Sequence, residues 1–167
     1  PIIHAVTLPN QVTLPYVEQG DPTGVPVLLL HGITDSWRSF EGVLSHLPTS
    51  LHAFALSQRG HGDATRPVMG YAPHDFAADL AAFVDILKLG PVIVVGHSMG
   101  SSIAQRFALD YPDRTLGLAA LLSSGRPGRG ALRRHVTTTS GRNTDWPSQS
   151  LWYEAQAGHI DRRHLYI

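Results

Sequence analysis

The sequence predicts an α/β fold in which an open, mostly parallel sheet carries helices on both faces. Two observations predict it. Short apolar runs alternate with segments whose apolar residues recur every three or four positions, and such repeated strand-helix-strand units require right-handed crossovers and parallel pairing. In addition, 167 residues with 43% hydrophobic and 16% charged residues are typical of one globular domain.

The first half of the chain contains the predicted edge of the sheet. The expected elements are a hairpin of residues 4–12 and 13–18, a strand of residues 25–30, a helix of about 36–47 and a strand of residues 51–56. The hairpin lies near an edge because Pro9 and Pro15 cannot donate to a central ladder. Val25–Leu30 is apolar throughout, as expected for a strand buried on both faces.

The second half continues the alternation. The expected elements are a helix from about 76 to 87 that finishes at Gly90, a strand of residues 91–95, a helix of residues 98–109 and a strand of residues 116–122. Asp75 and Asp79 stand early in the first of these helices, where the helix dipole favours anions. Its apolar stripe, which includes Phe76, Leu80 and Phe83, needs a sheet to cover.

A sharp strand-to-helix turn is predicted at Gly96-His97-Ser98-Met99-Gly100. A strand before it and a helix after it are the context of a nucleophile elbow, in which the turn leaves no room for side chains two residues from the serine. The alternative is a glycine-rich loop that binds phosphate or only turns the chain. As an elbow, the turn exposes Ser98 at the carboxyl edge of the sheet.

Two other loops are expected at that edge. His31-Gly32 follows one strand and Gln58-Arg59-Gly60 follows another, and ligands of open α/β sheets bind beyond the carboxyl ends of the strands. Ser98 needs a base and oxyanion donors to act as a nucleophile. The free N–H of Met99 at a helix start is one predicted donor, and the N–H of Ile33 is the second.

The histidines near these loops are expected to be structural. Gly32 allows close backbone approach, while His31 is predicted to hydrogen-bond neighbouring loop atoms rather than substrate. His97 is expected to point away from the attacking face and to be packed against a neighbouring strand. His61 is predicted to be another organiser of its loop.

Composition limits the partners. Thirteen basic residues balance thirteen acidic ones, which gives no electrostatic reason to expect nucleic acid. No apolar stretch approaches the roughly 18 residues that span a bilayer, and no signal region begins the sequence, so a soluble, cytoplasmic protein without a membrane partner is expected. Cysteine is absent, which excludes disulfides and thiolate sites.

The chain resembles the α/β-hydrolase family over about residues 10–124, in the branch of serine esterases, lactonases and carbon–carbon bond hydrolases. The resemblance rests on Leu28-Leu-Leu-His-Gly32 with Trp37 following, Ser57-Gln-Arg-Gly-His-Gly62, Tyr71 before an acidic amphipathic helix, and Val94-Val-Gly-His-Ser-Met-Gly100. It implies that Ser98 is the nucleophile and that Ile33 and Met99 form the oxyanion hole. The implied reaction is acyl transfer from a small-molecule ester, lactone or related carbonyl substrate to water, with neither metal nor organic cofactor.

The family's acid and histidine are not matched after the nucleophile. Asp145 and His159 superficially resemble the two loops, but the fourteen residues that separate them leave no room for a helix and a strand. His164, beside Asp161, is a weaker alternative. The sequence therefore predicts a core of residues 1–124 and an irregular tail or partial cap of residues 125–167, with the sheet incomplete at its C-terminal side.

Three functional hypotheses follow. The first is a serine hydrolase. The second is a catalytically incompetent fragment or binding module with this fold, and the third is half of a split or oligomeric enzyme that borrows its histidine. An incomplete sheet would expose the edge of the Leu116–Leu122 strand, which favours self-association unless the tail or another chain covers it.

Overall fold

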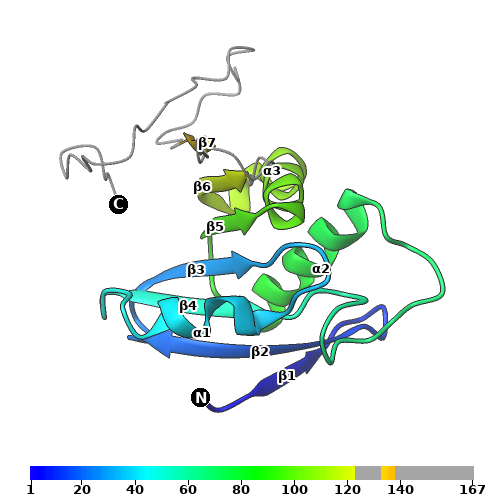
Figure 1. Cartoon of the computed structure of the whole chain (residues 1–167), viewed down its shortest axis with the longest axis horizontal. Coiled ribbons are helices and arrows are strands. Elements are labelled where there is room, and N and C mark those ends of the chain that lie inside the picture. Colours follow the sequence, from blue (N-terminus) through cyan, green and yellow to red (C-terminus); the bar gives the residue numbers. More distant parts are fainter. Residues whose placement is uncertain (123–132, 138–167) are drawn as a thin grey trace, which may run out of the picture.

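A computed structural model describes residues 1–122 and 133–137 of the chain (Figure 1). Its elements in chain order are β1 His4–Thr7, β2 Thr13–Gly20, β3 Val25–Leu30, the 3-10 helix η1 Trp37–Phe40, α1 Glu41–Leu44, β4 Leu51–Leu56, α2 Pro73–Ile86, β5 Val92–His97, α3 Met99–Asp110, the 3-10 helix η2 Pro112–Arg114, β6 Thr115–Leu122 and β7 Arg133–Thr137.

The strands form one seven-stranded sheet in the order β1-β2-β4-β3-β5-β6-β7. β4, β3, β5 and β6 are parallel to one another, whereas β1, β2 and β7 run antiparallel to their neighbours. The open, mostly parallel α/β sheet predicted from the sequence is therefore confirmed.

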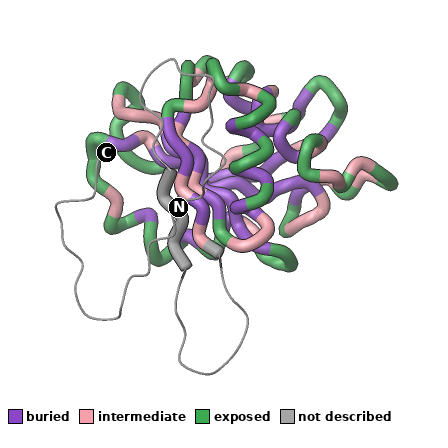
Figure 2. The backbone as a smooth tube through the Cα atoms, turned by 90° about the horizontal axis from the view of Figure 1, so that it is seen from above, coloured by how far each residue is buried: buried purple, intermediate pink, exposed green. Residues whose placement is uncertain are grey.

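Helices cover both faces of the sheet, as predicted. On one face, α2 and α3 bury Phe76, Phe83 and Phe107 against the central strands. On the other face, Trp37 and Phe40 of η1 pack with residues of β3 and β4. Figure 1 shows α1 and α2 on opposite sides of the sheet, and Figure 2 shows that buried positions follow the central strands.

The opening hairpin and its place near an edge of the sheet are confirmed. Thr7 pairs with Thr13, so β1 and β2 are antiparallel neighbours; β1 is the edge strand, and β2, next to it, also pairs with β4. Pro15 fits there because its carbonyl accepts from the Ser57 N–H at 2.8 Å, at the point where the ladder with β4 ends. On the side that faces β4, Pro15 therefore needs only its carbonyl, and its missing N–H costs no hydrogen bond.

The helix predicted over residues 36–47 was wrong in type and length. The segment consists of η1, one turn of α-helix in α1, and two further three-residue bonds from His46 N–H and Leu47 N–H to Val43 and Leu44 carbonyls. Gly42 in the middle of the segment and Pro48 after it both weaken a continuous α-helix.

The sheet edge at β6 is covered by β7, a strand that the sequence analysis missed. Leu122 pairs with Arg133 and Leu118 with Thr137 in an antiparallel ladder. Of the outcomes that the sequence left open for this edge, the structure shows the one in which part of the tail covers β6. The proposed boundary at residue 124 remains a prediction, since residues 123–132 lie outside the described part. Within the described ranges, no helix has both the length and the apolar character needed to cross a membrane.

Candidate active site

The predicted site residues lie on three segments that share one edge of the sheet. β3, β4 and β5 are parallel neighbours, so their carboxyl ends lie side by side. We call residues 31–36, after β3, the β3 loop, and residues 57–71, after β4, the β4 loop. Ser98 directly follows β5 and precedes α3.

Ser98 has a backbone conformation that few non-glycine residues adopt. Its φ is 53° and its ψ is −115°, and its N–H donates to the Leu121 carbonyl at 2.8 Å. Such strained geometry costs about 1–3 kcal/mol and persists only where the surroundings enforce it. The turn is therefore a sharp strand-to-helix bend with the serine, half-exposed, at its apex.

Crowding at the bend explains both glycines of the motif. A Cβ on Gly96 would lie 2.1 Å from the Gly100 carbonyl oxygen, and a Cβ on Gly100 would lie 2.3 Å from the Leu30 carbonyl oxygen. Both contacts are with backbone, which cannot turn aside as a side chain can. The two glycines let α3 start directly against β3 and β5.

The β3 loop touches the serine. A Cβ on Gly32 would lie 3.3 Å from the Ser98 Cβ and 3.2 Å from the His97 Nδ1, so only a residue without a side chain fits easily. Ile33 follows Gly32 and is 67% exposed. Met99 is the first residue of α3, where N–H groups have no acceptor within the helix. The assignment of Ile33 and Met99 as oxyanion donors stays a prediction.

His31 is fully buried and joins the β3 loop to the β4 loop. Its Nδ1–H donates to the Gly32 carbonyl at 2.7 Å, and its Nε2 accepts from the Gln58 N–H at 3.0 Å. Gln58 also donates from Nε2 to the His31 carbonyl at 3.0 Å. The imidazole must be neutral to make both bonds, and burial lowers the pKa of His31 below its usual value.

This neutral histidine makes stability depend on pH. Because the folded-state pKa of His31 lies below the unfolded value of about 6.5, unfolded chains take up the proton first as the pH falls. The free energy of unfolding should be unaffected by His31 above that value and then decrease, by at most about 1.4 kcal/mol per pH unit, down to the folded pKa. Urea unfolding between pH 8 and 5 measures it.

The comparison is with the variant His31→Leu, which should remove this part of the slope. A slope that is the same in wild type and His31→Leu would show that another group titrates.

The other two histidines differ in how well they were predicted. The Nδ1 of His61 interacts with the Arg59 carbonyl at 2.8 Å, and its ring lies 5.2 Å from that of His31, in keeping with an organiser of the β4 loop. His97 was predicted wrongly: its side chain is exposed, with Nδ1 beside Gly32 rather than buried against a strand. The bend after β5 turns it toward the β3 loop.

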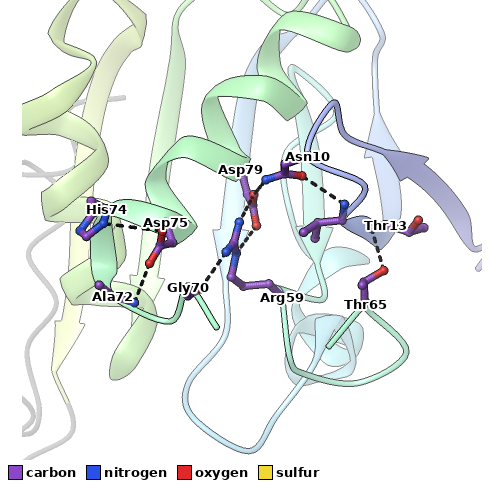
Figure 3. A network of polar contacts seen from close by, with 10 residues as sticks. Asn10, Thr13, Arg59, Thr65, Gly70, Ala72, His74, Asp75 and Asp79 are labelled. Carbon is purple, nitrogen blue, oxygen red and sulfur yellow. Dashed lines mark hydrogen bonds and ion pairs between the residues drawn. The ribbon is translucent and has the colours of Figure 1, made fainter. Parts of the chain in front are cut away.

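A buried ion pair behind the β4 loop was missed (Figure 3). Arg59 is bound by Asp79 of α2, and the side chains are 7% and 3% exposed. Asp75 does accept from the Ala72 N–H at 2.9 Å at the start of α2, as the dipole argument requires, but Asp79 faces inward. Asp79 stands three residues after Phe76 and four before Phe83, which puts it on the apolar stripe, and this spacing was the signal that it needed a buried partner.

The predicted base and acid cannot be compared with this geometry. Asp145, His159, Asp161 and His164 all lie outside the described residues. The site described is therefore a strained serine, a close glycine loop beside it and a histidine-linked second loop. In enzymes that catalyse acyl transfer, a bend of this kind brings a nucleophile together with backbone N–H donors.

Comparison with known proteins decides the family. The family model described as the alpha/beta hydrolase fold matches residues 25–163. This chain belongs to the α/β-hydrolase family. The match includes the β3 loop, the β4 loop and Ser98, and the strand-bend-helix at Ser98 is the context in which this family places its nucleophile.

Relatives in this α/β-hydrolase family differ in the activities for which they are named. The chain is 35% identical to the 2-(acetamidomethylene)succinate hydrolase of Mesorhizobium japonicum and 34% identical to a soluble epoxide hydrolase of a Corynebacterium species, in each case over 67% of this chain and 40% or 38% of the relative. The solved structure of an N-acyl homoserine lactone degrading enzyme has a TM-score of 0.64 and 30% identity, over 68% of this chain and 44% of that one.

This α/β-hydrolase chain spans about two fifths of the length of the curated relatives it matches. The residues that the family model matches, 25–163, include the strands and loops that build the bend. The activity of a complete protein is therefore a matter for proposal.

Proposed function

We propose that this chain carries the nucleophile and oxyanion hole of a serine hydrolase that transfers an acyl group from a small ester, lactone or related carbonyl substrate to water. The observation that carries the proposal is the strained Ser98 bend with Gly32 against its Cβ. Ser98 would attack the carbonyl carbon, and the N–H groups of Ile33 and Met99 would bind the oxyanion.

A serine at the bend favours carbonyl substrates over epoxides, although one relative is named an epoxide hydrolase. Attack of a carboxylate on an epoxide gives an ester, which water can cleave. Attack of the Ser98 hydroxyl would give an ether, which would stay on the enzyme. A carbonyl substrate instead gives an acyl-serine that water hydrolyses. One structurally similar protein is an enzyme that degrades a lactone, which is a carbonyl substrate of this kind.

The second candidate is a catalytically incomplete chain with the same fold. It is supported by the limited span, 40% and 38% of the relatives' lengths. In the part that the structure describes, both ring nitrogens of His31 are hydrogen-bonded, Nδ1 to the Gly32 carbonyl and Nε2 to the Gln58 N–H, so this imidazole has no nitrogen left to act as the base for Ser98. The base would then come from another histidine, such as His159 or His164, or from another chain.

A labelling experiment separates the two. Folded protein is incubated with a fluorophosphonate probe, the modified serine is mapped by mass spectrometry, and hydrolysis of a short-chain chromogenic ester is followed. If the first candidate holds, Ser98→Ala should abolish labelling and lower turnover by about 10³-fold or more. Ser102→Ala removes an exposed hydroxyl one helical turn away and should change neither.

Two outcomes would count against the serine hydrolase. Folded wild-type protein that remains unlabelled would favour the incomplete chain. Turnover that persists in Ser98→Ala would assign the hydrolysis to another group.

A further inference from the structure

The Arg59–Asp79 ion pair is buried and takes no part in the chemistry proposed for Ser98. Arg59 Nε donates to Asp79 Oδ2 at 2.6 Å and Arg59 Nη2 donates to Asp79 Oδ1 at 2.5 Å, which is a bidentate arrangement. Hydrogen bonding to Asp79 raises the pKa of Arg59, so the arginine keeps its charge. Two charges held almost entirely away from solvent need a reason for being there.

Further hydrogen bonds extend the pair into a network that joins three segments (Figure 3). Arg59 Nη1 donates to the Gly70 carbonyl at 2.7 Å, which links the two ends of the β4 loop. Asn10 Nδ2 donates to Asp79 Oδ1 at 2.9 Å, and Asn10 Oδ1 accepts from the Val12 N–H at 3.1 Å, which links α2 to the turn between β1 and β2. Arg59 is therefore held from both sides.

The residue before Arg59 is the one that holds His31. Gln58 uses its N–H and its Nε2 to bind His31, while its Oε1 is buried without a partner among the described residues. The side chain of Gln58 thus has no other anchor in that part of the chain. Its carbonyl accepts from the His61 N–H at 3.0 Å, and its backbone position is further set by its neighbours, Ser57, whose N–H binds the Pro15 carbonyl, and Arg59.

Stability alone is a weak reason for such a pair. Desolvation of two buried charges offsets most of their attraction, and well-packed apolar residues of similar volume are often as stable or more stable. Apolar residues, however, cannot fix the orientation of a side chain as hydrogen bonds do. The bidentate pair fixes the orientation of the Arg59 guanidinium plane, and the third bond to Gly70 fixes it further.

We infer that Arg59 and Asp79 are positioning residues that fix Gln58 against His31 and thereby hold the β3 loop beside Ser98. The path runs from Asp79 through Arg59 and Gln58 to His31, whose Nδ1–H holds the carbonyl of Gly32 next to the serine. Its catalytic purpose rests on the proposed function, but the path itself is a matter of loop geometry and is tested without activity.

The first test is amide hydrogen exchange by NMR in Asp79→Asn. The Gln58 amide, which binds His31 Nε2, should exchange at least about tenfold faster relative to the Leu28 amide in β3. Asp85→Asn is the matched control, because Asp85 lies on the same helix and binds Arg114 at 2.7 Å at the surface. It should leave the ratio unchanged. If the Gln58 and Leu28 amides accelerate equally, the pair serves global stability and the inference is overturned.

The second test replaces the pair by apolar side chains, Arg59→Met with Asp79→Leu, so that no charge is left buried alone. The Leu28 amide should keep its wild-type protection while the Gln58 amide still exchanges at least about tenfold faster. Wild-type protection at both amides would overturn the inference.

Labelling of Ser98 by the fluorophosphonate in this double variant should be slowed at least about tenfold. Labelling at the wild-type rate despite fast Gln58 exchange would refute the link to the serine. If wild-type protein is not labelled at all, the proposed function fails, and the exchange ratio still decides whether the pair positions the loop.

Discussion

Gly100→Ala is expected to lower the free energy of unfolding by about 3 kcal/mol or more. The added Cβ would lie 2.3 Å from the Leu30 carbonyl oxygen and 2.9 Å from the His31 carbonyl oxygen. These are backbone atoms of β3 and its loop, so relief requires α3 to move away from the sheet. Overpacking of a buried site by a single methyl typically costs about 1–3 kcal/mol, and rigid surroundings put this position at the upper end.

Urea unfolding monitored by circular dichroism measures this effect, with Gly42→Ala as the matched control. A Cβ on Gly42 meets nothing within 4 Å, and alanine is favoured over glycine in a helix by up to about 1 kcal/mol. Gly42→Ala should therefore be neutral or stabilising. A Gly100→Ala protein as stable as wild type would mean that α3 does not start as close to β3 as the structure has it.

His31→Leu is expected to have the second large effect: it should lower the free energy of unfolding by about 2–5 kcal/mol at pH 8. Leucine fills a similar volume but leaves the Gln58 N–H and the Gly32 carbonyl without their partner, and each unsatisfied buried group costs about 1–3 kcal/mol. The same change frees the β3 loop, so fluorophosphonate labelling of Ser98 should slow as well.

His46→Leu is the control for this prediction. The Nδ1 of His46 interacts with the Gly42 carbonyl at 3.0 Å, a bond of the same kind, but on an exposed side chain. Water replaces a partner lost at the surface, so the change should stay within about 0.5 kcal/mol. Equal losses in the two variants would remove the argument that burial makes His31 important.

Most strands of the sheet could be predicted because each one is marked by an apolar pattern within a few consecutive residues. Val25–Leu30 and Leu51–Leu56 were bounded correctly from their apolar runs alone. The 36–47 segment was not, since the choice between an α-helix and 3-10 turns depends on how Trp37 and Phe40 pack on β3 and β4. β7 was missed because Arg133–Thr137 carries no period-two pattern, and only pairing with β6 makes it a strand.

The candidate site divides in the same way. The glycine spacing around Ser98 predicted the bend, because the bend leaves no room for side chains two residues from the serine. This steric requirement involves only five consecutive residues and can therefore be recognised in the sequence. The partner of Asp79 and the direction of His97 depend on atoms that are distant in sequence. Burial of Asp79 could be suspected from its spacing to Phe76 and Phe83, but nothing local identifies Arg59 as its partner.

By itself, the sequence determined the α/β sheet, the family resemblance and the serine at a strand-to-helix bend, since hydrophobic periodicity and backbone crowding act over a few residues. Only the tertiary structure decided that His31 is neutral and binds two loops, that Arg59 and Asp79 stand behind them, and that Gly32 lies against Ser98. Those contacts join residues up to 66 positions apart (Gly32 to Ser98), and their energies arise from burial that exists only once the strands are assembled.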